Sequence, residues 1–341
     1  MFVGDNGAGK TNLLEAVSLL VPGRGLRGAR FADMAMQGGP AGWAVAARFE
    51  SGLEIGTGAV DGAPDRREFR LNGVKPRAQS EVAEQLAAVW LTPQMDRLFT
   101  DAASGRRKFL DRLVIALEPS HAREIAAFES ASAQRNRLLA ASSYDPAWMQ
   151  ALEDGMARHA VAATAARAAL VARLNATLAA GLADPFPRVV LDLGCVIAQR
   201  LAAAPAVQVE DWLRAALAAA RLVDSQAKSA SYGPQKADLQ MQDARSGQPA
   251  AQASTGQQKA MLVGTILGHA ATIKAVRGTP PLLLLDEPLV HLDSARRQAL
   301  FMALARADYP AWLTGTDMQP FAGFEAAAYQ VAGGQVTPLP A

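Results

Sequence analysis

Continuous apolar runs are the clearest feature in the pattern of hydrophobic and polar positions along the chain. They occur at residues 89–91 and 282–285, and Trp312-Leu313 begins a further segment, 312–314, that predicts a buried strand. Runs of this length without alternation are typical of strands that a parallel sheet buries on both faces. The apolar stretch 255–276, which stops at Gly278, is long enough for a buried helix. Together these segments predict an α/β fold with a sheet flanked by helices.

Shorter segments predict an additional antiparallel β subdomain near the N-terminus. They are residues 44–50, 53–57 and 68–71. Asn72-Gly73 follows the last of them and is a strong signal for a tight turn. A second hairpin is predicted near the C-terminus, where residues 329–331 and 335–337 flank Gly333-Gly334. The predicted sheet is therefore mixed, with parallel and antiparallel strands.

Residues 121–183 have an almost wholly helical pattern, interrupted at 144–146 by Tyr-Asp-Pro. Large apolar residues recur every four positions and so share one helix face: Trp148, Leu152 and Met156, then Leu170, Leu174, Leu178 and Leu182. Two helices joined by a turn predict an antiparallel helical arm. A helix pair within a core is the alternative. The stretch is rich in alanine and has few large side chains with which to build a globular core, which favours the arm. Residues 210–223 predict a further helix, and 188–193 predict a strand.

A glycine-rich segment at the N-terminus fits the phosphate-loop pattern G-x-x-x-x-G-K-[ST]. Glycines allow consecutive backbone N–H groups to converge on a phosphate, and a helix that follows adds its N-terminal dipole. Lys10 can reach the outer phosphates, and the hydroxyl of Thr11 can bind Mg²⁺. A simple glycine-rich turn is the weaker alternative. The predicted ATP-binding residues are Gly4, Asp5, Asn6, Gly7, Ala8, Gly9, Lys10 and Thr11.

The strand that should precede a phosphate loop is almost absent. Only Met1-Phe2-Val3 stand ahead of Gly4, whereas strands usually run to about five or six residues. We therefore expect the first N-terminal strand to be missing and the natural chain to begin upstream.

Two acidic residues, Asp286 and Glu287, follow the apolar run at 282–285. At a strand end, Asp286 can hold Mg²⁺ directly or through water. Glu287 can polarise the attacking water as a general base. An acidic pair after an apolar strand is often only a strand cap. Combined with the phosphate loop, it indicates a nucleotide hydrolysis site.

A second anion site is predicted at the start of the helix that follows residue 254. Ser254, Gly256 and Gln257 combine a hydroxyl, an open backbone and a helix N-terminus. One nucleotide already has its phosphates in the loop at 4–11, so a second site suggests a second copy of the chain. An ordinary N-cap is the alternative for Ser254.

The overall charge does not decide between partners. The net charge is only +2, although seven of the 34 basic residues are lysine and the others arginine. Arg24, Arg27 and Arg30 could reach a nucleotide or DNA phosphate, and a solvated basic loop is about as consistent with them. The basic helix start at 104–112 leaves the same two alternatives open.

Cysteine usage and hydropathy give the expected compartment. Cys195 is the only cysteine, so no disulfide forms within the chain, which fits a reducing compartment. No run of about 18 apolar residues predicts a membrane helix. Met1 leads almost directly into the phosphate loop, which argues against a signal peptide. We expect a cytoplasmic protein without a membrane partner.

The order of these motifs resembles the ABC-type ATPases. That resemblance adds Gln94, in a glutamine-containing loop, to the catalytic residues Asp286 and Glu287 and makes it a further candidate ligand of Mg²⁺. It places Asp293 in the loop after the acidic pair. In that superfamily two protomers enclose two ATP molecules, and Ser254, Gly256 and Gln257 of one would contact the γ-phosphate held by the other.

Within the superfamily the chain resembles the RecF family over nearly its whole length. The matching blocks are residues 4–16, Thr92-Pro93, Arg106-Arg107 with 109–111, Arg135-Asn136 with 138–139, Gly233-Pro234 with 238–239, 254–258 and 283–287. Gln235, Thr255 and Glu287 depart from the common family residues, which are His, Gln and Asp. The resemblance implies an ATPase head at 1–115 and 186–341 and an inserted helical arm at 116–185.

The resemblance also implies a function. A RecF-like protein would bind ATP and Mg²⁺ and close as a homodimer on single-stranded DNA or gap junctions. It would act with RecO and RecR, and indirectly with RecA, in recombinational gap repair, replication restart and the SOS response. Residues 314–316 stand where ABC transporters carry a switch histidine, so hydrolysis would be slow. The resemblance implies a weak, DNA-stimulated ATPase that acts mainly as an ATP-gated DNA clamp. A transporter subunit, an SMC-like DNA ATPase, an ATP-gated clamp that scarcely hydrolyses and a single-site kinase are the alternatives.

Overall fold

The computed structural model describes residues 1–36, 38–39, 42–141, 143–307 and 309–340. The chain divides into two compact units, which are taken separately below. Unit 1 comprises Met1–Asp96, Gly181–Pro187 and Ser254–Ala341, and unit 2 comprises Arg97–Ala180 and Arg188–Ala253. Unit 2 takes in more of the chain than the range 116–185 expected for the helical arm. The predicted division into head and arm stays a prediction.

A six-stranded sheet forms the centre of unit 1. Its strands lie in the order β11-β10-β1-β9-β8-β5. Neighbours run parallel except for the terminal hairpin of β10 and β11. The strands are β1 (Phe2–Val3), β5 (Ala88–Leu91), β8 (Leu282–Leu285), β9 (Ala311–Gly315), β10 (Tyr329–Ala332) and β11 (Gln335–Pro338). The mixed α/β sheet predicted from the sequence is confirmed.

The N-terminal strand expected to be missing is present as only two residues. β1 pairs with β9 on one side and with β10 on the other, so it occupies an interior position in the sheet. Phe2 lies between two aromatic rings, with its centroid 4.9 Å from that of Trp312 and 5.3 Å from that of Tyr329. Because Phe2 and Val3 directly precede Gly4, this short strand connects the N-terminal end of the phosphate loop to the sheet.

The helices of unit 1 differ in how clearly local signals mark their ends. They are α1 (Lys10–Ser18), α2 (Gln79–Gln85), α9 (Thr255–Arg277) and α10 (Ser294–Ala307). Ser254 and Gln257 form a capping box at the start of α9, and Gly278 ends it in the left-handed conformation at φ 74°. Among the described helices of the chain, none is long and apolar enough to span a membrane.

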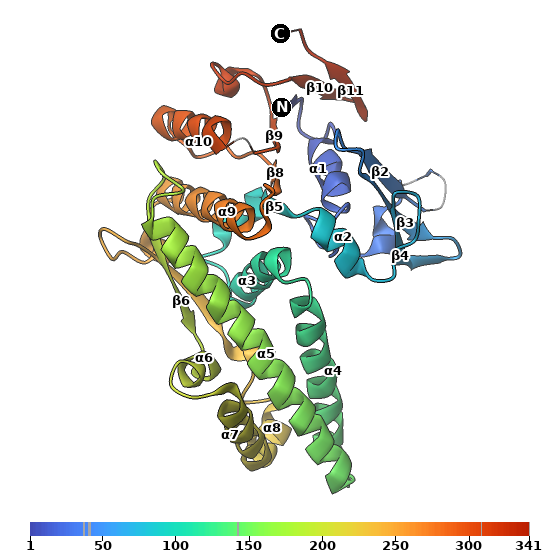
Figure 1. Cartoon of the computed structure of the whole chain (residues 1–341), viewed down its shortest axis with the longest axis vertical. Helices are drawn as coiled ribbons and strands as arrows, with labels where there is room; N and C mark the ends of the chain where they lie inside the picture. Colours follow the sequence, from blue (N-terminus) through green and yellow to red (C-terminus); the bar gives the residue numbers. More distant parts are fainter. Residues whose placement is uncertain (37, 40–41, 142, 308, 341) are drawn as a thin grey trace. The chain divides into compact units, whose positions relative to one another are not determined.

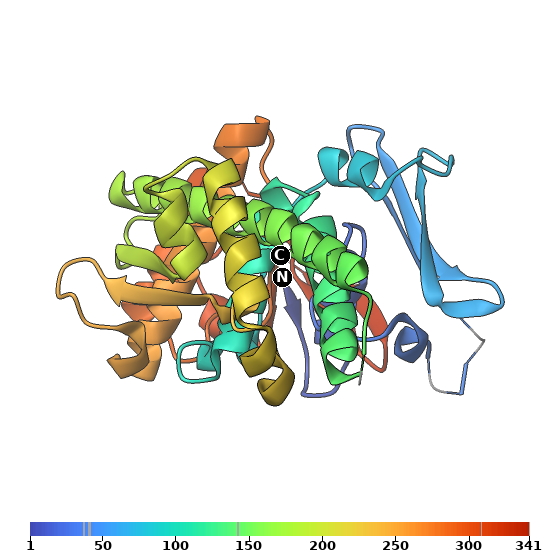
Figure 2. The same cartoon turned by 90° about the horizontal axis from the view of Figure 1, so that it is seen from below.

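The antiparallel β subdomain is a separate three-stranded sheet within unit 1, in the order β2-β3-β4. Its strands are β2 (Ala44–Arg48), β3 (Glu54–Val60) and β4 (Ala63–Leu71), drawn in blue in Figures 1 and 2. The Asn72-Gly73 turn follows β4, and both residues have positive φ, 50° and 79°. The β subdomain predicted from the short strands is therefore present.

Unit 2 is built mainly from helices. They are α3 (Ala103–Leu117), α4 (His121–Ala140), α5 (Pro146–Ala179), α6 (Val196–Leu201), α7 (Ala206–Ala219) and α8 (Arg221–Ala227). Both views show α4 and α5 side by side (Figures 1 and 2). Asp145 caps α5 by accepting the Ala147 N–H at 2.8 Å, and Pro146 occupies its first turn.

The remaining elements of unit 2 cover α5. An antiparallel pair, β6 (Val189–Gly194) and β7 (Asp238–Asp243), packs on α3 and α5, and α6 and α7 also contact α5. The single helix predicted at 210–223 is wrong in its bounds, because α7 ends at Ala219 and α8 starts anew at Arg221. Leu182 was placed on the face of α5, yet it follows the helix and is 61% exposed. The four-residue spacing of leucines thus continues past Ala179, where α5 ends.

Candidate nucleotide-binding site

The loop between β1 and α1 has the backbone conformation that its glycines predict. Gly7 and Gly9 have φ values of 84° and 105°, which other residues rarely adopt. A Cβ atom on Gly4 would lie 2.2 Å from the carbonyl oxygen of Val331, so no side chain fits there. The sequence folds this way because glycine alone satisfies both demands.

Lys10 is buried at the foot of this loop and is only 5% exposed. Its Nζ donates to the carbonyl oxygens of Gly4 at 2.6 Å and Asp5 at 3.0 Å. Both partners are neutral, so the ammonium charge is hydrogen-bonded without an opposite charge among the described contacts. Such an arrangement suits a lysine that meets an anionic ligand.

Asp286 lies at the carboxyl end of β8, in direct contact with the loop. Its carboxylate oxygens accept the hydroxyl of Thr11, at 3.1 and 3.0 Å, and that of Thr314, at 2.8 Å. Its backbone N–H donates to Leu91 at 2.9 Å, which fixes it beside β5. Asp286 is 3% exposed. The fold thus joins two predicted site residues that are 275 positions apart in sequence.

Thr314 is a site residue that the sequence reasoning did not identify as such. It is the fourth of the five residues of β9 and is 1% exposed. Its hydroxyl donates to Asp286 and accepts the backbone N–H of Glu287 at 2.9 Å. Glu287 has a φ of 47°, in the left-handed region. A cavity of about 90 Å³ lies beside it and is lined by both residues. A polar residue at the end of the neighbouring parallel strand was the available signal.

Gln94 stands at the same edge of the sheet, in the short 3₁₀ helix Pro93–Arg97 that follows β5. β5 and β8 are parallel with Leu91 opposite Leu285, so the segments after both strands leave the sheet together. The Gln94 side chain is exposed. Two residues further on, the carboxylate of Asp96 accepts Nζ of Lys259, the fifth residue of α9, at 2.7 Å. This buried ion pair ties the start of α9 to the turn that carries Gln94.

The predicted second anion site is exposed and self-capped. Oε1 of Gln257 accepts the Ser254 hydroxyl and the Ser254 N–H, both at 3.0 Å. A Cβ atom on Gly256 would lie 3.1 Å from the carbonyl oxygen of His291, so the loop before α10 lies against this helix start. Asp293 caps α10 by accepting the Arg296 N–H at 2.8 Å. Among the described residues, no hydrogen bond joins the Ser254 segment to the phosphate loop.

Arg27 and Arg30, in the loop after α1, have defined partners. Arg27 donates from Nη1 to Asn12 at 2.8 Å and from its backbone N–H to Glu15 at 2.8 Å. Burial raises the pKa of Glu15, and the hydrogen bond and charge of Arg27 oppose that rise. Arg30 pairs with Asp65 at 3.4 Å on the surface. The loop is therefore anchored to α1 at Arg27.

Thr11 and Asp286 also fit the Mg²⁺ predicted from the sequence. The buried Asp286 carboxylate is met by two hydroxyls, and no basic side chain contacts it among the described residues, so a divalent cation would offset a charge that is costly to bury. Within the described chain, no cluster of three or more His, Cys, Asp or Glu side chains could hold a metal alone. In nucleotide sites Mg²⁺ typically uses one or two carboxylates together with phosphates.

Comparison with known proteins identifies the family. A protein of Mesorhizobium japonicum named DNA replication and repair protein RecF is 46% identical, over 94% of this chain and 86% of its own length. A protein of the same name from Rhizobium rhizogenes is 42% identical, over 99% of this chain and 92% of its own length. The chain belongs to the RecF family.

Solved structures agree with the fold. A structure described as the recombination mediator protein RecF with ATP in the RecFOR pathway has a TM-score of 0.82 and 19% identity, and the match covers 99% of this chain and 91% of that one. The same protein with ATPrS matches equally well. No protein-family model matches the sequence.

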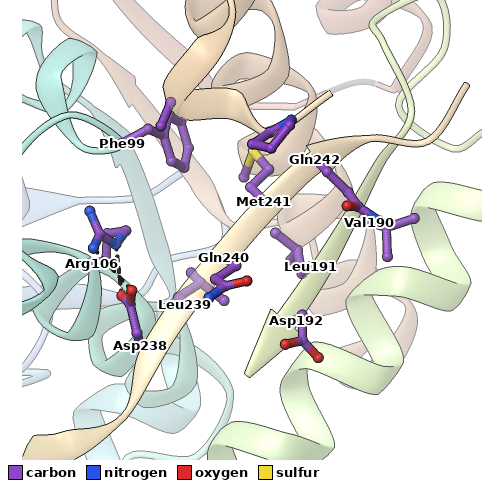
Figure 3. A pocket seen from close by; sticks show the side chains of 12 residues that line it. Phe99, Arg106, Val190, Leu191, Asp192, Asp238, Leu239, Gln240, Met241 and Gln242 are labelled. Atoms are coloured by element: carbon purple, nitrogen blue, oxygen red, sulfur yellow. Dashed lines mark hydrogen bonds and ion pairs between the residues drawn. The ribbon is translucent and has the colours of Figure 1, made fainter. Parts of the chain in front are cut away.

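Two RecF blocks of the sequence meet inside unit 2. Arg106 forms a double hydrogen bond with Asp238 at 2.7 and 3.0 Å, and the two side chains point toward one another in Figure 3. Arg107 donates to the carbonyl oxygen of Ala237 at 2.9 Å. Both guanidinium groups thus have partners within unit 2, and the phosphate-contacting alternative for this helix start stays a prediction. The pocket of about 530 Å³ in Figure 3 contains none of the predicted site residues.

Proposed function

We propose that unit 1 binds and slowly hydrolyses ATP. The observation that carries the proposal is the meeting of the phosphate loop with Asp286 through the Thr11 hydroxyl. Lys10 and Asp286, two buried charges of opposite sign, stand at this place with neutral partners. A nucleoside triphosphate with Mg²⁺ would supply the opposite charge to each of them, the phosphates to Lys10 and the cation to Asp286.

The space beside α1 supports a nucleotide rather than free phosphate. A cavity of about 560 Å³ begins at Asn12, next to Thr11, and is lined also by Glu15, Arg27, Met34 and Trp43. Ligand pockets for small molecules span roughly 300–1,000 Å³ and combine apolar walls with a few polar groups. The indole and thioether would face the base, and Asn12 with Arg27 would face the ribose and inner phosphate.

Hydrolysis would use the acidic pair. Mg²⁺ held by Thr11 and Asp286 would neutralise charge on the phosphates. Glu287 would orient and deprotonate the attacking water, with Gln94 at the same edge of the sheet. The absence of a histidine at 314–316 supports slow hydrolysis, and we propose that DNA stimulates it.

We further propose that ATP closes a homodimer. Ser254, Gly256 and Gln257 are accessible at the start of α9, as expected of a surface that receives a phosphate from outside the protomer. Asp293 lies in the loop packed against Gly256, so it would take part in the same interface. The self-capping bond between Ser254 and Gln257 would open to free the hydroxyl.

Family membership supports the biological role. The chain would act in the cytoplasm as an ATP-dependent clamp on single-stranded DNA or gap junctions. With RecO and RecR it would assist RecA loading in recombinational gap repair and replication restart, and so contribute to SOS induction.

Sedimentation with and without ATP tests the core of the proposal. Glu287→Gln should form a dimer with ATP and Mg²⁺, because hydrolysis no longer removes the ligand. Ser254→Arg should bind ATP normally yet remain a monomer. If Glu287→Gln binds ATP and no dimer forms at any protein concentration, the dimer model fails. If the chain does not bind ATP at all, the site assignment fails as well.

DNA binding is tested by its dependence on salt. Contacts to DNA phosphates release counterions, so affinity in the presence of ATP should fall steeply as salt rises. An affinity that does not change with salt would contradict the DNA part of the proposal.

A further inference from the structure

Thr314 stands between the two acidic residues of the site. β9 lies next to β8 with Leu313 opposite Leu285, so Thr314 is placed level with Asp286. Its hydroxyl donates to Oδ1 of Asp286 at 2.8 Å and accepts the N–H of Glu287 at 2.9 Å. Almost none of its surface is exposed to solvent.

The hydroxyl group of Thr314 can make both bonds, to the Asp286 carboxylate and to the Glu287 N–H, at the same time. It has one proton to donate and lone pairs to accept, and here each is used on a different residue. The β-branched side chain of threonine also limits its rotation, which keeps the oxygen in one place. Valine has nearly the same shape and can make neither bond.

The second bond acts on an unusual backbone. Glu287 has a φ of 47°, which non-glycine residues adopt only when their surroundings hold them. The backbone N–H that Thr314 binds belongs to this residue. The bond therefore helps to set the direction in which the Glu287 side chain leaves the strand.

The cavity beside Glu287 could hold the water molecule that its side chain would orient. Its volume of about 90 Å³ exceeds the roughly 10–15 Å³ that one water molecule requires. Thr314 and Phe321 line it together with Glu287. Gly315 permits the close approach of Phe321, since a Cβ atom there would lie 2.5 Å from the ring.

We propose that Thr314 is a positioning residue for ATP hydrolysis, which holds Asp286 and Glu287 in register with one hydroxyl group. This inference rests on the proposed function. Thr314 does not touch the substrate; it acts through the carboxylate that would hold Mg²⁺ and through the backbone of the general base. Its loss should therefore lower turnover and leave the affinity for ATP in place.

Three variants test the inference. Thr314→Val removes the hydroxyl and keeps the shape, and Thr314→Ser keeps the hydroxyl. Thr272→Val is the matched control, because Thr272 is a buried threonine of α9 whose hydroxyl donates to the carbonyl oxygen of Gly268 at 2.9 Å, and it does not line the cavity beside Glu287. Each purified full-length chain is assayed for ATP affinity without Mg²⁺, for the Mg²⁺ concentration that gives half the maximal rate, and for single-turnover hydrolysis.

Thr314→Val should lose about 10- to 100-fold in the hydrolysis rate, the range that a small misplacement of catalytic groups causes. It should need more Mg²⁺ and bind ATP without Mg²⁺ as the wild type does. Thr314→Ser should recover most of the rate, and Thr272→Val should behave as the wild type.

Other outcomes overturn the inference. Wild-type hydrolysis by Thr314→Val would remove the proposed role, while the proposed ATPase function would stand. Equal loss of ATP affinity and rate in Thr314→Val and Thr314→Ser would indicate a packing role only. If the wild-type chain binds no ATP, the proposed function fails, and the role of Thr314 fails with it.

Discussion

Buried charges are handled differently in the helical core of unit 2 and at the phosphate loop of unit 1. In unit 2, Arg135 is fully buried and donates to Glu153 at 3.0 Å, to Asp224 at 2.7 Å and to the carbonyl oxygen of Leu217 at 2.7 Å. In unit 1, the buried Lys10 meets only backbone carbonyls and Asp286 meets hydroxyls and a backbone group. A charge paired within the chain fixes architecture, whereas a charge left with neutral partners is available to a charged ligand.

The same contrast separates residues that the sequence makes look alike. Arginine and lysine side chains at Arg106, Arg135 and Lys10 all belong to blocks that resemble the RecF family. Arg106 and Arg135 form ion pairs with carboxylates of unit 2. Lys10 is hydrogen-bonded at the phosphate loop without a counterion among the described contacts. The partner that each charge finds in the fold tells a structural role from a binding role.

The largest expected effect breaks the paired side of the comparison. Arg135→Met leaves Asp224 buried without its cation, and breaking a buried pair costs about 3–5 kcal/mol. The free energy of unfolding, measured in urea, should fall by that amount. Arg137→Met, on the exposed face of the same helix, should change it by less than about 0.5 kcal/mol. Equal losses in both variants would contradict the assignment.

Lys10→Ala breaks the unpaired side. Affinity for ATP should fall about 100-fold or more, because the phosphates lose their ammonium partner. Each tenfold step in affinity corresponds to about 1.4 kcal/mol. The free energy of unfolding without nucleotide should fall by no more than about 1.5 kcal/mol, because only hydrogen bonds to carbonyls are lost. Binding of a fluorescent ATP analogue and urea unfolding measure the two effects. A variant that unfolds as easily as Arg135→Met would erase the contrast.

Acid should weaken unit 2 through Asp111. Burial alone would raise its pKa, but hydrogen bonds from His121 and Arg167 outweigh burial and lower the pKa. Because the folded-state pKa lies below the value of about 3.9 in an unfolded chain, the stabilisation is full above about pH 4. It is lost as the pH falls through the folded-state pKa.

Unfolding measured at several pH values from 6 down to 3 checks this effect. Asp111→Asn should show a shallower loss of stability at acid pH than the wild type. Asp211→Asn, which removes an exposed carboxylate on α7, should keep the wild-type slope. If the Asp111 and Asp211 variants have the same slope, the pairing of Asp111 with Arg167 does not control acid stability.

The smallest effect is expected where a charge pair lies on the surface. Arg30 and Asp65 are 3.4 Å apart, with side chains 68% and 61% exposed. Exposed pairs contribute about 0–1 kcal/mol and are screened by salt. Arg30→Gln should therefore leave unfolding nearly unchanged. A loss of more than about 1 kcal/mol would show that exposure alone does not separate the classes of charge.

The sequence determined those features that depend on neighbours along the chain. Periodicity located α4 and α5, the apolar run located β8, and Ser254 and Gly278 marked the ends of α9. The glycines of the phosphate loop were equally clear, because their conformational demands are local. Leu182 and the boundary between α7 and α8 were misjudged, since the spacing of apolar residues does not fix where a helix ends.

Only the tertiary structure decided which distant groups meet. Thr314 gained its place when β9 paired with β8, and Arg106 gained its carboxylate partner in Asp238, 132 positions away. The two residues of β1 became an interior strand because β9 and β10 flank them. Local propensity acts over a few residues, whereas the partner of a hydroxyl or a charge is chosen by the packing of the whole chain, and that choice is not written in any single segment.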